Sequence, residues 1–100
     1  MNDLNLDSLP TDPGIYKMLD HLGDVIYVGK SKNIRKRVKS YFSNSKRHDF
    51  KTSVMVTHIV KVECVVVNSE SEALLLENQF IKSYRPKYNI LLKDDKSFPY

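Results

Sequence analysis

Glu77 is the first residue whose surroundings suggest chemistry, because it is an acid beside the apolar stripe of a predicted helix. Ala73 and Leu74 precede it by four and three residues, and Phe80 and Ile81 follow it by three and four, so its neighbours on the helix surface are apolar. A carboxylate at the border of a core needs a cation, a hydrogen-bond donor or a metal ion, because an unpaired buried charge is costly. The plainer alternative is that Glu77 lies at the edge of the stripe and reaches water or one lysine.

Two tyrosines, Tyr16 and Tyr27, are predicted to share one face of a small β-sheet. Residues 14–19 and 24–29 have the composition of strands, and the four residues 20–23 between them, ending in Gly23, predict a hairpin loop. With that loop length Tyr16 lies directly opposite Tyr27, and their side chains form one group. A change of one residue in the loop would place the two rings on opposite faces.

These groups match the needs of phosphodiester hydrolysis, which are an anchor for a divalent cation, positive charge at the phosphate and a group that handles water. Glu77 is the candidate ligand for one Mg²⁺ or Mn²⁺ ion, and Arg37 is the candidate clamp for the scissile phosphate. Tyr27 or Tyr16 is the candidate that orients or deprotonates the water. Lys30, three residues after Tyr27, is expected to lower the pKa of that hydroxyl.

Positive charge is concentrated in one part of the chain. Ten of the 16 Lys and Arg residues fall within 25–62, where Asp49 is the only acid, although the net charge of the chain is +4. This pattern favours a polyanion such as DNA over a solvated helix face, because solvated faces usually interleave acids. Binding to a membrane surface is the weaker alternative, since the apolar stripe of the basic helix is narrow. The DNA-binding candidates are Lys30, Lys32, Arg35, Lys36, Arg37, Lys39, Lys46 and Arg47.

The elements that hold these groups follow from local patterns. Apolar periodicity predicts helices over 34–42, 49–58 and 70–84 and a third strand over 59–67. Ser31 or Asn33 is expected to cap the first helix, and Ser69 with Glu72 has the spacing of a capping box at the start of the last one. We therefore expect an α/β (α+β) fold with a small, mainly antiparallel three-stranded sheet flanked by helices.

Length and composition limit the class of protein. One hundred residues with 41% hydrophobic and 28% charged content are typical of one globular domain. A single cysteine, Cys64, permits no internal disulfide and fits a reducing compartment. No apolar run exceeds four residues, whereas a membrane-spanning helix needs ~20. We expect a cytoplasmic protein without a membrane partner, and a domain that is monomeric.

The tripeptides GIY at 14–16 and YVG at 27–29 resemble the two motifs that name the GIY-YIG nuclease family, with Val28 in place of Ile. The likeness covers residues 13–92 and includes a downstream Arg, a helix-borne Glu and a late Asn in the family's order. It leaves 1–12 as a polar lead and 93–100 as a tail, which we expect to be truncated from a longer chain.

The resemblance implies the GIY-YIG fold, one divalent ion held by Glu77, and catalytic roles for the residues that match the family's motifs. These residues are Tyr16, Tyr27, Lys30, Arg37, Tyr41, Glu77 and Asn89.

Within the family, the segments YVGKSKNIRKRVKSYF and RPKYNILLKDDKSFPY are most similar to the amino-terminal endonuclease domain of UvrC-type subunits in bacterial nucleotide excision repair. This likeness implies incision on the 3′ side of a lesion, with UvrB and damaged DNA as partners of the full-length protein. Two alternatives stay open. One is a non-catalytic nucleic-acid-binding module, and the other is a stand-alone GIY-YIG nuclease acting on branched or single-stranded DNA.

Overall fold

The computed structural model describes residues 6–42 and 50–90. No helix in these ranges is long and apolar enough to cross a membrane. A helical turn over 87–90 ends the described chain. The elements, in order, are the 3-10 helix η1 (Leu6–Ser8), β1 (Gly14–Leu19), β2 (Val25–Ser31), α1 (Ile34–Phe42), α2 (Phe50–His58), β3 (Lys61–Val66) and α3 (Glu70–Tyr84).

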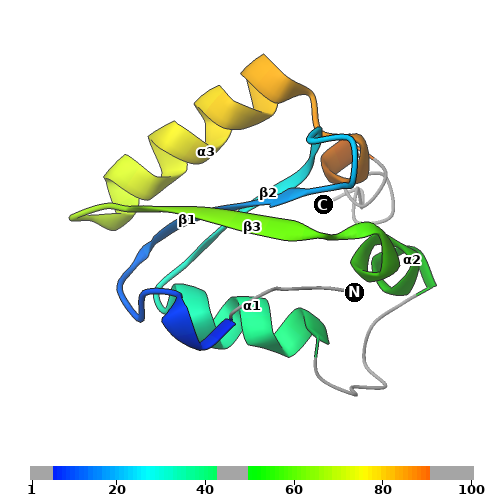
Figure 1. Cartoon of the computed structure of the whole chain (residues 1–100). Helices are drawn as coiled ribbons and strands as arrows, with labels where there is room; N and C mark the ends of the chain where they lie inside the picture. The colour runs from blue at the N-terminus through cyan, green and yellow to red at the C-terminus, as the bar shows by residue number, and fades with distance from the viewer. Residues whose placement is uncertain (1–5, 43–49, 91–100) are drawn as a thin grey trace.

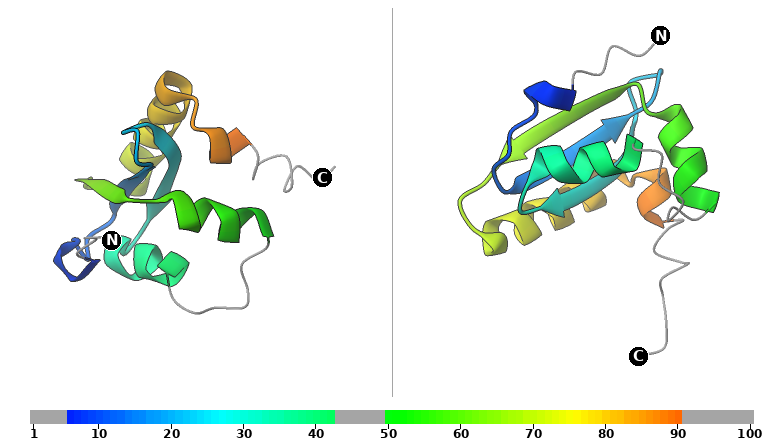
Figure 2. Two further views of the ribbon diagram at one scale, coloured as in Figure 1. Left: turned by 45° about the vertical axis from the view of Figure 1, so that its right-hand side comes forward. Right: turned by 90° about the horizontal axis from the view of Figure 1, so that it is seen from below.

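The three strands form one antiparallel sheet in the order β2-β1-β3, so β1 is central and β2 and β3 are the edges. Helix α3 covers one face of the sheet, and α1 with η1 covers the other (Figure 1). Seen from below, α1 lies across its face of the sheet, with α2 beside it (Figure 2). The predicted fold class is confirmed.

Each face of the sheet has its own hydrophobic cluster, because alternate residues of β1 point to opposite faces. Tyr16 and Met18 pack on the α1 side with Ile34, whereas Ile15 packs on the α3 side with Ala73. Helices 34–42 and 70–84 and strand β1 have the predicted bounds. Strand β2 runs two residues further than predicted, and β3 is shorter at both ends. Helix α2 begins at Phe50, and the predicted start at residue 49 lies outside the described residues.

The pairing of the first two strands differs from the predicted register. Tyr16 pairs with Gly29, and Tyr27 pairs with Met18, so the two tyrosines are diagonal neighbours and the prediction that they lie directly opposite each other is wrong. The shift amounts to two residues. Because side chains alternate with a period of two, both tyrosines still point to the same face.

The two-residue shift has two local causes. The loop contains three residues, 21–23, since Asp20 N–H donates to the Asp24 carbonyl, and Gly23 takes the left-handed conformation (φ 87°) that such loops require at their end. In addition, β2 carries a bulge. Leu19 pairs with Val25 and Met18 pairs with Tyr27, so Ile26, which lies between these two residues of β2, has no partner in β1. The bulge lets Ile26 and the following tyrosine pack on the same side of the sheet.

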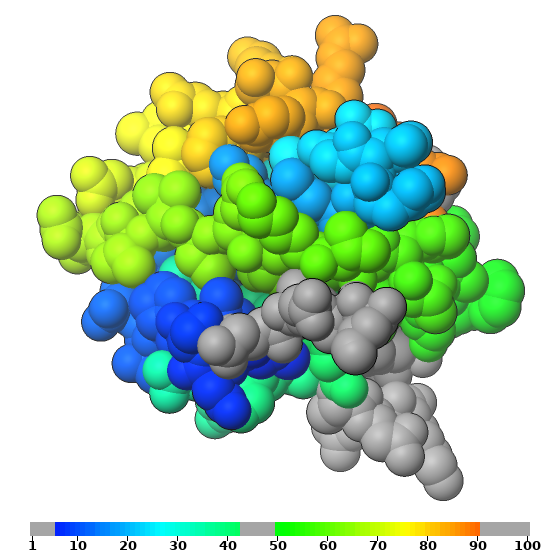
Figure 3. Space-filling model, viewed as in Figure 1, coloured from blue at the N-terminus to red at the C-terminus, as the bar shows by residue number. Residues whose placement is uncertain are grey.

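The described part of the predicted polar lead, residues 6–12, packs against α1 (Figure 3). Leu9 is buried, and its carbonyl accepts a hydrogen bond of 2.8 Å from Arg35 Nε. Asp7 forms an ion pair of 2.8 Å with Lys39. The basic helix therefore obtains acidic and carbonyl partners from a distant part of the chain.

Candidate active site

Strands β1 and β2 and helix α1 bring three tyrosines into one cluster. The ring centroids of Tyr16 and Tyr27 are 6.3 Å apart, and the Tyr41 ring lies 6.1 Å from each. The hydroxyl oxygens of Tyr16 and Tyr41 are 3.1 Å apart and hydrogen-bonded. Tyr16 and Tyr41 are buried, whereas Tyr27 is half-buried. We call Tyr16, Tyr27 and Tyr41 the tyrosine cluster.

Gly29 makes room for this cluster. A Cβ atom at position 29 would collide with the ring and the hydroxyl of Tyr16, which lies across the strand from it. The glycine of the second tripeptide is therefore required by the tyrosine of the first. This dependence follows from the observed register and is absent from the predicted one.

Burial raises the pKa of both Tyr16 and Tyr27 above the ordinary value of 10.0. The adjacent Tyr41 raises the pKa of each further, and Arg37 only partly opposes the shift. The prediction that a nearby lysine lowers the pKa of Tyr27 is therefore wrong in its net effect. At neutral pH these side chains are uncharged hydroxyl groups, which can orient a water molecule through hydrogen bonds.

Arg37 connects the tyrosine cluster to solvent. Its guanidinium carbon lies 5.0 Å from the centre of the Tyr41 ring, one helical turn further along α1, and its interaction with Tyr16 helps to raise the pKa of the guanidinium. Arg37 is exposed. Because a guanidinium carries five N–H donors, donors remain for a phosphate outside the cluster. The spacing of four residues is the sequence signal that could have placed Tyr41 here without reference to any family.

Glu77 approaches β2 from α3, on the other side of the sheet. Its side chain is half-buried, and burial raises the pKa of its carboxyl group, while Lys30 opposes that rise. Its charge also contributes to the raised pKa of Tyr27. Among the described residues, no side chain forms an ion pair or hydrogen bond with this carboxylate. The expected apolar surroundings are only partly present, since Leu74 is 49% exposed.

Asn89 fastens the outer edge of β2. Its Oδ1 accepts a hydrogen bond of 2.7 Å from the Val28 backbone N–H, and its Nδ2 donates one of 2.9 Å to the Val28 carbonyl. The side-chain amide thus replaces a neighbouring strand at the residue that separates Tyr27 from Gly29. Among the described residues, the side-chain hydrogen bonds of Asn89 go to the backbone of β2 and not to the carboxylate of Glu77.

The residues present fit one divalent ion with a single protein ligand. No group of three or more His, Cys, Asp or Glu side chains that could hold a metal occurs in the described parts of the chain. Mg²⁺ commonly keeps several waters and binds proteins through one or two carboxylates. A half-buried carboxylate without a side-chain partner suits that coordination.

The predicted DNA-binding residues fall into three groups. Arg35, Lys39 and Lys32 have partners within the chain, the last through an ion pair of 3.3 Å with Glu70. Lys30, Lys36 and Arg37 are exposed. Lys46 and Arg47 lie outside the described residues. Local sequence patterns did not reveal the acidic partners, because Asp7 and Glu70 lie far from α1 along the chain.

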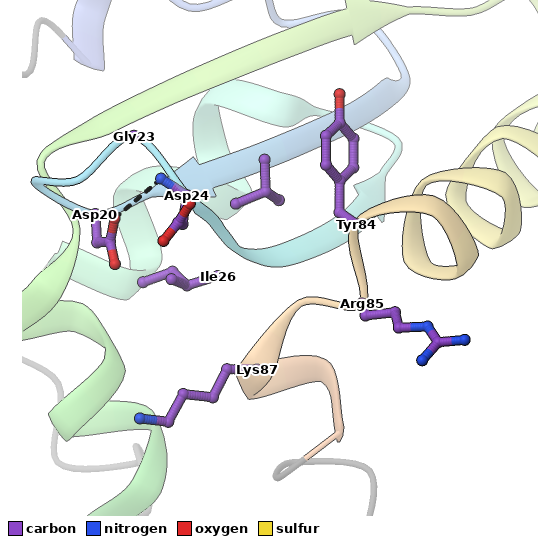
Figure 4. A pocket seen from close by; sticks show the side chains of 8 residues that line it. Asp20, Gly23, Asp24, Ile26, Tyr84, Arg85 and Lys87 are labelled. Atoms are coloured by element: carbon purple, nitrogen blue, oxygen red, sulfur yellow. Dashed lines mark hydrogen bonds between the residues drawn. The ribbon is translucent and has the colours of Figure 1, made fainter.

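Two described pockets flank the middle of β2. One, of about 460 Å³, lies between the hairpin loop, which contributes Asp20 and Asp24, and the carboxyl end of α3 with Tyr84, and its Arg85 and Lys87 side chains point apart (Figure 4). The other, of about 300 Å³, lies at the opposite end of β2 and includes Lys30. Glu77 lies between them along α3, because the first pocket contacts the end of this helix and the second its beginning.

Comparison with known proteins agrees with this geometry. The UvrC-like GIY-YIG domain family model matches residues 12–90. The UvrABC system protein C of Idiomarina loihiensis is 56% identical over 99 residues, which are 99% of this chain and 16% of that protein. Its counterpart in Salinibacter ruber is 53% identical over 95 residues, which are 95% of this chain and 15% of that protein. The chain thus spans about one sixth of these relatives.

A solved structure of similar fold is the GIY-YIG N-terminal endonuclease domain of UvrC from Thermotoga maritima, bound to magnesium as its catalytic divalent cation. It has a TM-score of 0.72 and 35% sequence identity, and the match covers 83% of this chain and 89% of that one. Point mutants of that domain at one asparagine and at each of three tyrosines also hold the cation. By sequence and by fold, the chain belongs to the UvrC-like GIY-YIG domain family.

Proposed function

We propose that this chain is a divalent-metal-dependent DNA endonuclease domain that hydrolyses a phosphodiester bond and leaves 3′-hydroxyl and 5′-phosphate ends. The observation that carries the proposal is the half-buried Glu77 carboxylate, which has no side-chain partner among the described residues and lies close enough to Tyr27 to affect its pKa. Membership of a family whose solved relatives are endonuclease domains with a bound catalytic cation supports it.

Each side chain has a distinct task in this reaction. A divalent ion bound at Glu77 supplies Lewis-acid stabilisation of the charge that develops on the phosphate; we propose Mg²⁺, with Mn²⁺ as a working substitute. Arg37 holds the non-bridging phosphate oxygens through its exposed N–H donors. Tyr27, as a neutral hydroxyl, orients the attacking water. Lys30 adds positive charge beside the phosphate.

The remaining residues keep these groups in place. Tyr16 and Tyr41 hold each other through a hydrogen bond between their hydroxyl groups, and the Arg37 guanidinium lies beside the Tyr41 ring. Asn89 fixes the backbone of β2 next to Tyr27. Because the tyrosine cluster is built into the hydrophobic core, the water-handling hydroxyl is in position before DNA binds.

A nicking assay on supercoiled plasmid tests the proposal. The chain should convert the plasmid to the open circle with Mg²⁺ or Mn²⁺ and should fail to do so with a chelator. Glu77→Gln should slow nicking by a factor of about 10³, as expected when the group that anchors the main electrostatic stabiliser is lost. Asp24→Asn removes an exposed carboxylate in the hairpin loop and is the matched control, expected to leave the rate unchanged.

Other outcomes would favour the alternatives. DNA binding without nicking under any divalent ion would indicate a non-catalytic binding module. Nicking that is much faster on branched or single-stranded DNA than on duplex would indicate a stand-alone structure-specific nuclease. Unchanged activity of Glu77→Gln would contradict the metal site itself.

We further propose that in a longer protein this domain makes the 3′-side incision of a UvrC-type excision nuclease, which acts with UvrB on damaged DNA in the cytoplasm. The chain spans about one sixth of its UvrABC system protein C relatives, so we assign recognition of the lesion and of UvrB to other parts of such a protein. Accordingly, the isolated 100 residues should act as a monomer and nick damaged and undamaged duplexes at equal rates.

A further inference from the structure

The pocket of about 300 Å³ at the carboxyl end of β2 adjoins the proposed site without containing any of its tyrosines. Its lining is Pro13, Lys30, Ser31, Lys32, Glu70 and Ala73. Lys30 connects the pocket to the site, because it is the cation that opposes the raised pKa of the Glu77 carboxyl. Ala73 precedes Glu77 by one turn of α3. A phosphate in this pocket would therefore lie beside the one being cut.

Lys32 and Glu70, which both line this pocket, form an ion pair. Lys32 Nζ lies 3.3 Å from Glu70 Oε2, and the two side chains are 84% and 75% exposed. Exposed pairs of this kind contribute little to folding. Glu70 lies in the first turn of α3, where the helix dipole favours a negative charge, and it occupies Lys32 as a phosphate oxygen would.

Charge distinguishes this pocket from the one beside the hairpin loop. The hairpin pocket has two carboxylates, Asp20 and Asp24, and its two cations point apart (Figure 4). The pocket at Lys30 has two cations and a single carboxylate, and that carboxylate is on an exposed, rotatable side chain. If the Glu70 side chain moves away, the pocket at Lys30 has two cations and no carboxylate, whereas loss of one carboxylate from the hairpin pocket leaves the other in place.

We propose that the pocket formed by Lys30, Ser31, Lys32 and Glu70 binds the phosphate adjacent to the scissile phosphate, with Lys32 as its contact and Glu70 as an internal competitor for that lysine. The inference rests on the proposed nuclease function and adds to it a subsite and a carboxylate that limits substrate affinity. Binding of the DNA strand exchanges the Lys32–Glu70 pair for a Lys32–phosphate pair.

Affinity for DNA tests both parts of the proposal. Binding of a fluorescent duplex is measured in a chelating buffer, so that no cleavage occurs. Lys32→Gln should weaken binding and lower the slope of log K against log salt by about 0.9, the value for one phosphate contact in duplex DNA. Glu70→Gln should tighten binding about twofold to fivefold, the range spanned by exposed ion pairs. Asp24→Asn, the matched control, should change affinity less.

The double variant separates competition from simple repulsion. If Glu70 acts by occupying Lys32, Glu70→Gln should tighten binding in the wild-type background and have no effect in the Lys32→Gln background. An equal gain in both backgrounds would show that Glu70 only repels DNA, and the proposal of a competitor would be wrong. Thermal unfolding of each variant confirms that the fold is intact, as the exposure of both residues leads us to expect.

Single methylphosphonate linkages locate the phosphate. Each removes the charge of one phosphate in the duplex, and one position beside the cut should weaken binding to the wild type while leaving binding to Lys32→Gln unchanged. Equal losses for both proteins at every position would overturn the subsite. Nicking by the wild type is scored separately with Mg²⁺. If the wild type nicks DNA but the variants and methylphosphonates show none of these binding differences, only the subsite is refuted. If the binding differences appear but no nicking occurs, only the nuclease function is refuted.

Discussion

The two halves of the proposed site are built in different ways. The tyrosine cluster is part of the hydrophobic core, with ring centroids 6.1 to 6.3 Å apart and a hydroxyl pair at 3.1 Å. The acidic half, Glu77 with Lys30, stands on the opposite face of the edge strand, where Lys30 is exposed and Glu77 is half-buried. The first half is held by packing within the core, whereas the second depends on how α3, which carries Glu77, lies against β2, which carries Lys30.

This difference separates stability from activity. Removing a group from the tyrosine cluster leaves a cavity or an unpaired hydroxyl in the core, so it should reduce the free energy of unfolding as well as the rate. Removing a group from the acidic half breaks no side-chain hydrogen bond or ion pair of Glu77 among the described residues, so it should reduce the rate without reducing the free energy of unfolding. The structure thus predicts two classes of inactive variant, which unfolding experiments can distinguish.

Arg37→Ala tests where the boundary between the two halves lies and, after Glu77→Gln, has the largest expected effect. We expect nicking to slow by about 10² to 10³, as for other lost electrostatic donors at a developing charge. Because Arg37 is exposed, the free energy of unfolding should fall by less than ~1 kcal/mol. Lys36→Ala, the adjacent exposed cation, is the control and should weaken DNA binding without slowing the step at saturating DNA. A large loss of stability in Arg37→Ala would assign this residue to the core half.

Gly29→Ala tests whether the tyrosine cluster depends on packing. The new methyl group would meet the Tyr16 ring, and overpacking of this kind costs about 1–3 kcal/mol; urea unfolding should give a value at the upper end. Gly23→Ala is the matched control, since a Cβ atom at position 23 would have no neighbour within 4 Å and only its positive φ is penalised, by about 1 kcal/mol. Equal stability losses at the two glycines would contradict the close contact between Gly29 and Tyr16.

Local sequence patterns were sufficient for most elements and for the shared face of the tyrosines. The bounds of β1, α1 and α3 agree with the prediction because each element has a clear apolar period and, in α3, a cap: Ser69 accepts the N–H of Glu72. The predicted register of β1 and β2 was wrong by two residues, because neither the three-residue loop nor the bulge at Ile26 has a residue composition that marks it in the sequence. The loop and the bulge each shift the register by one residue. Because the total shift of two is an even number, the two tyrosines stay on the predicted face.

The electrostatics of the site were harder to predict. The basic helix contains no acids, so the pairing of its Lys39 with Asp7, and that of the preceding Lys32 with Glu70, has no local signal. The net rise in the pKa of Tyr16 and Tyr27 also depends on their burial and on their contacts with each other and with Tyr41. The ion pairs and the tyrosine pKa values both depend on contacts between segments that are distant in the sequence. By contrast, the sequence of one helix is enough to show that Glu77 is an acid beside an apolar stripe.

Asn89→Ala tests how firmly β2 must be held between the two halves. The variant loses both hydrogen bonds to Val28, and an unsatisfied backbone group costs about 1–3 kcal/mol when water cannot reach it; at a sheet edge we expect the lower end. Nicking should slow while Mg²⁺ affinity, measured by calorimetry, stays unchanged, because Glu77 is carried by α3. Asn68→Ala, on an exposed residue, is the control. Loss of Mg²⁺ affinity in Asn89→Ala would indicate that Asn89 acts on the metal site directly.

The smallest effect concerns the pH dependence of stability at Glu77. Burial raises the pKa of this carboxyl in the folded state above 4.5, its ordinary value. Its contribution to stability is therefore fully present below pH 4.5 and is lost as the pH rises through the folded-state pKa. Glu77→Gln, which stays neutral, should gain stability relative to wild type between pH 4 and pH 7, by less than ~1 kcal/mol for a half-exposed group. Urea unfolding at both pH values measures the difference.

Added Mg²⁺ should then stabilise the wild type and leave Glu77→Gln unchanged, because only the carboxylate binds the ion. A relative loss of stability in the variant on going to pH 7 would mean that the carboxylate has a favourable partner in the fold, and the acidic half would then be built like the tyrosine cluster.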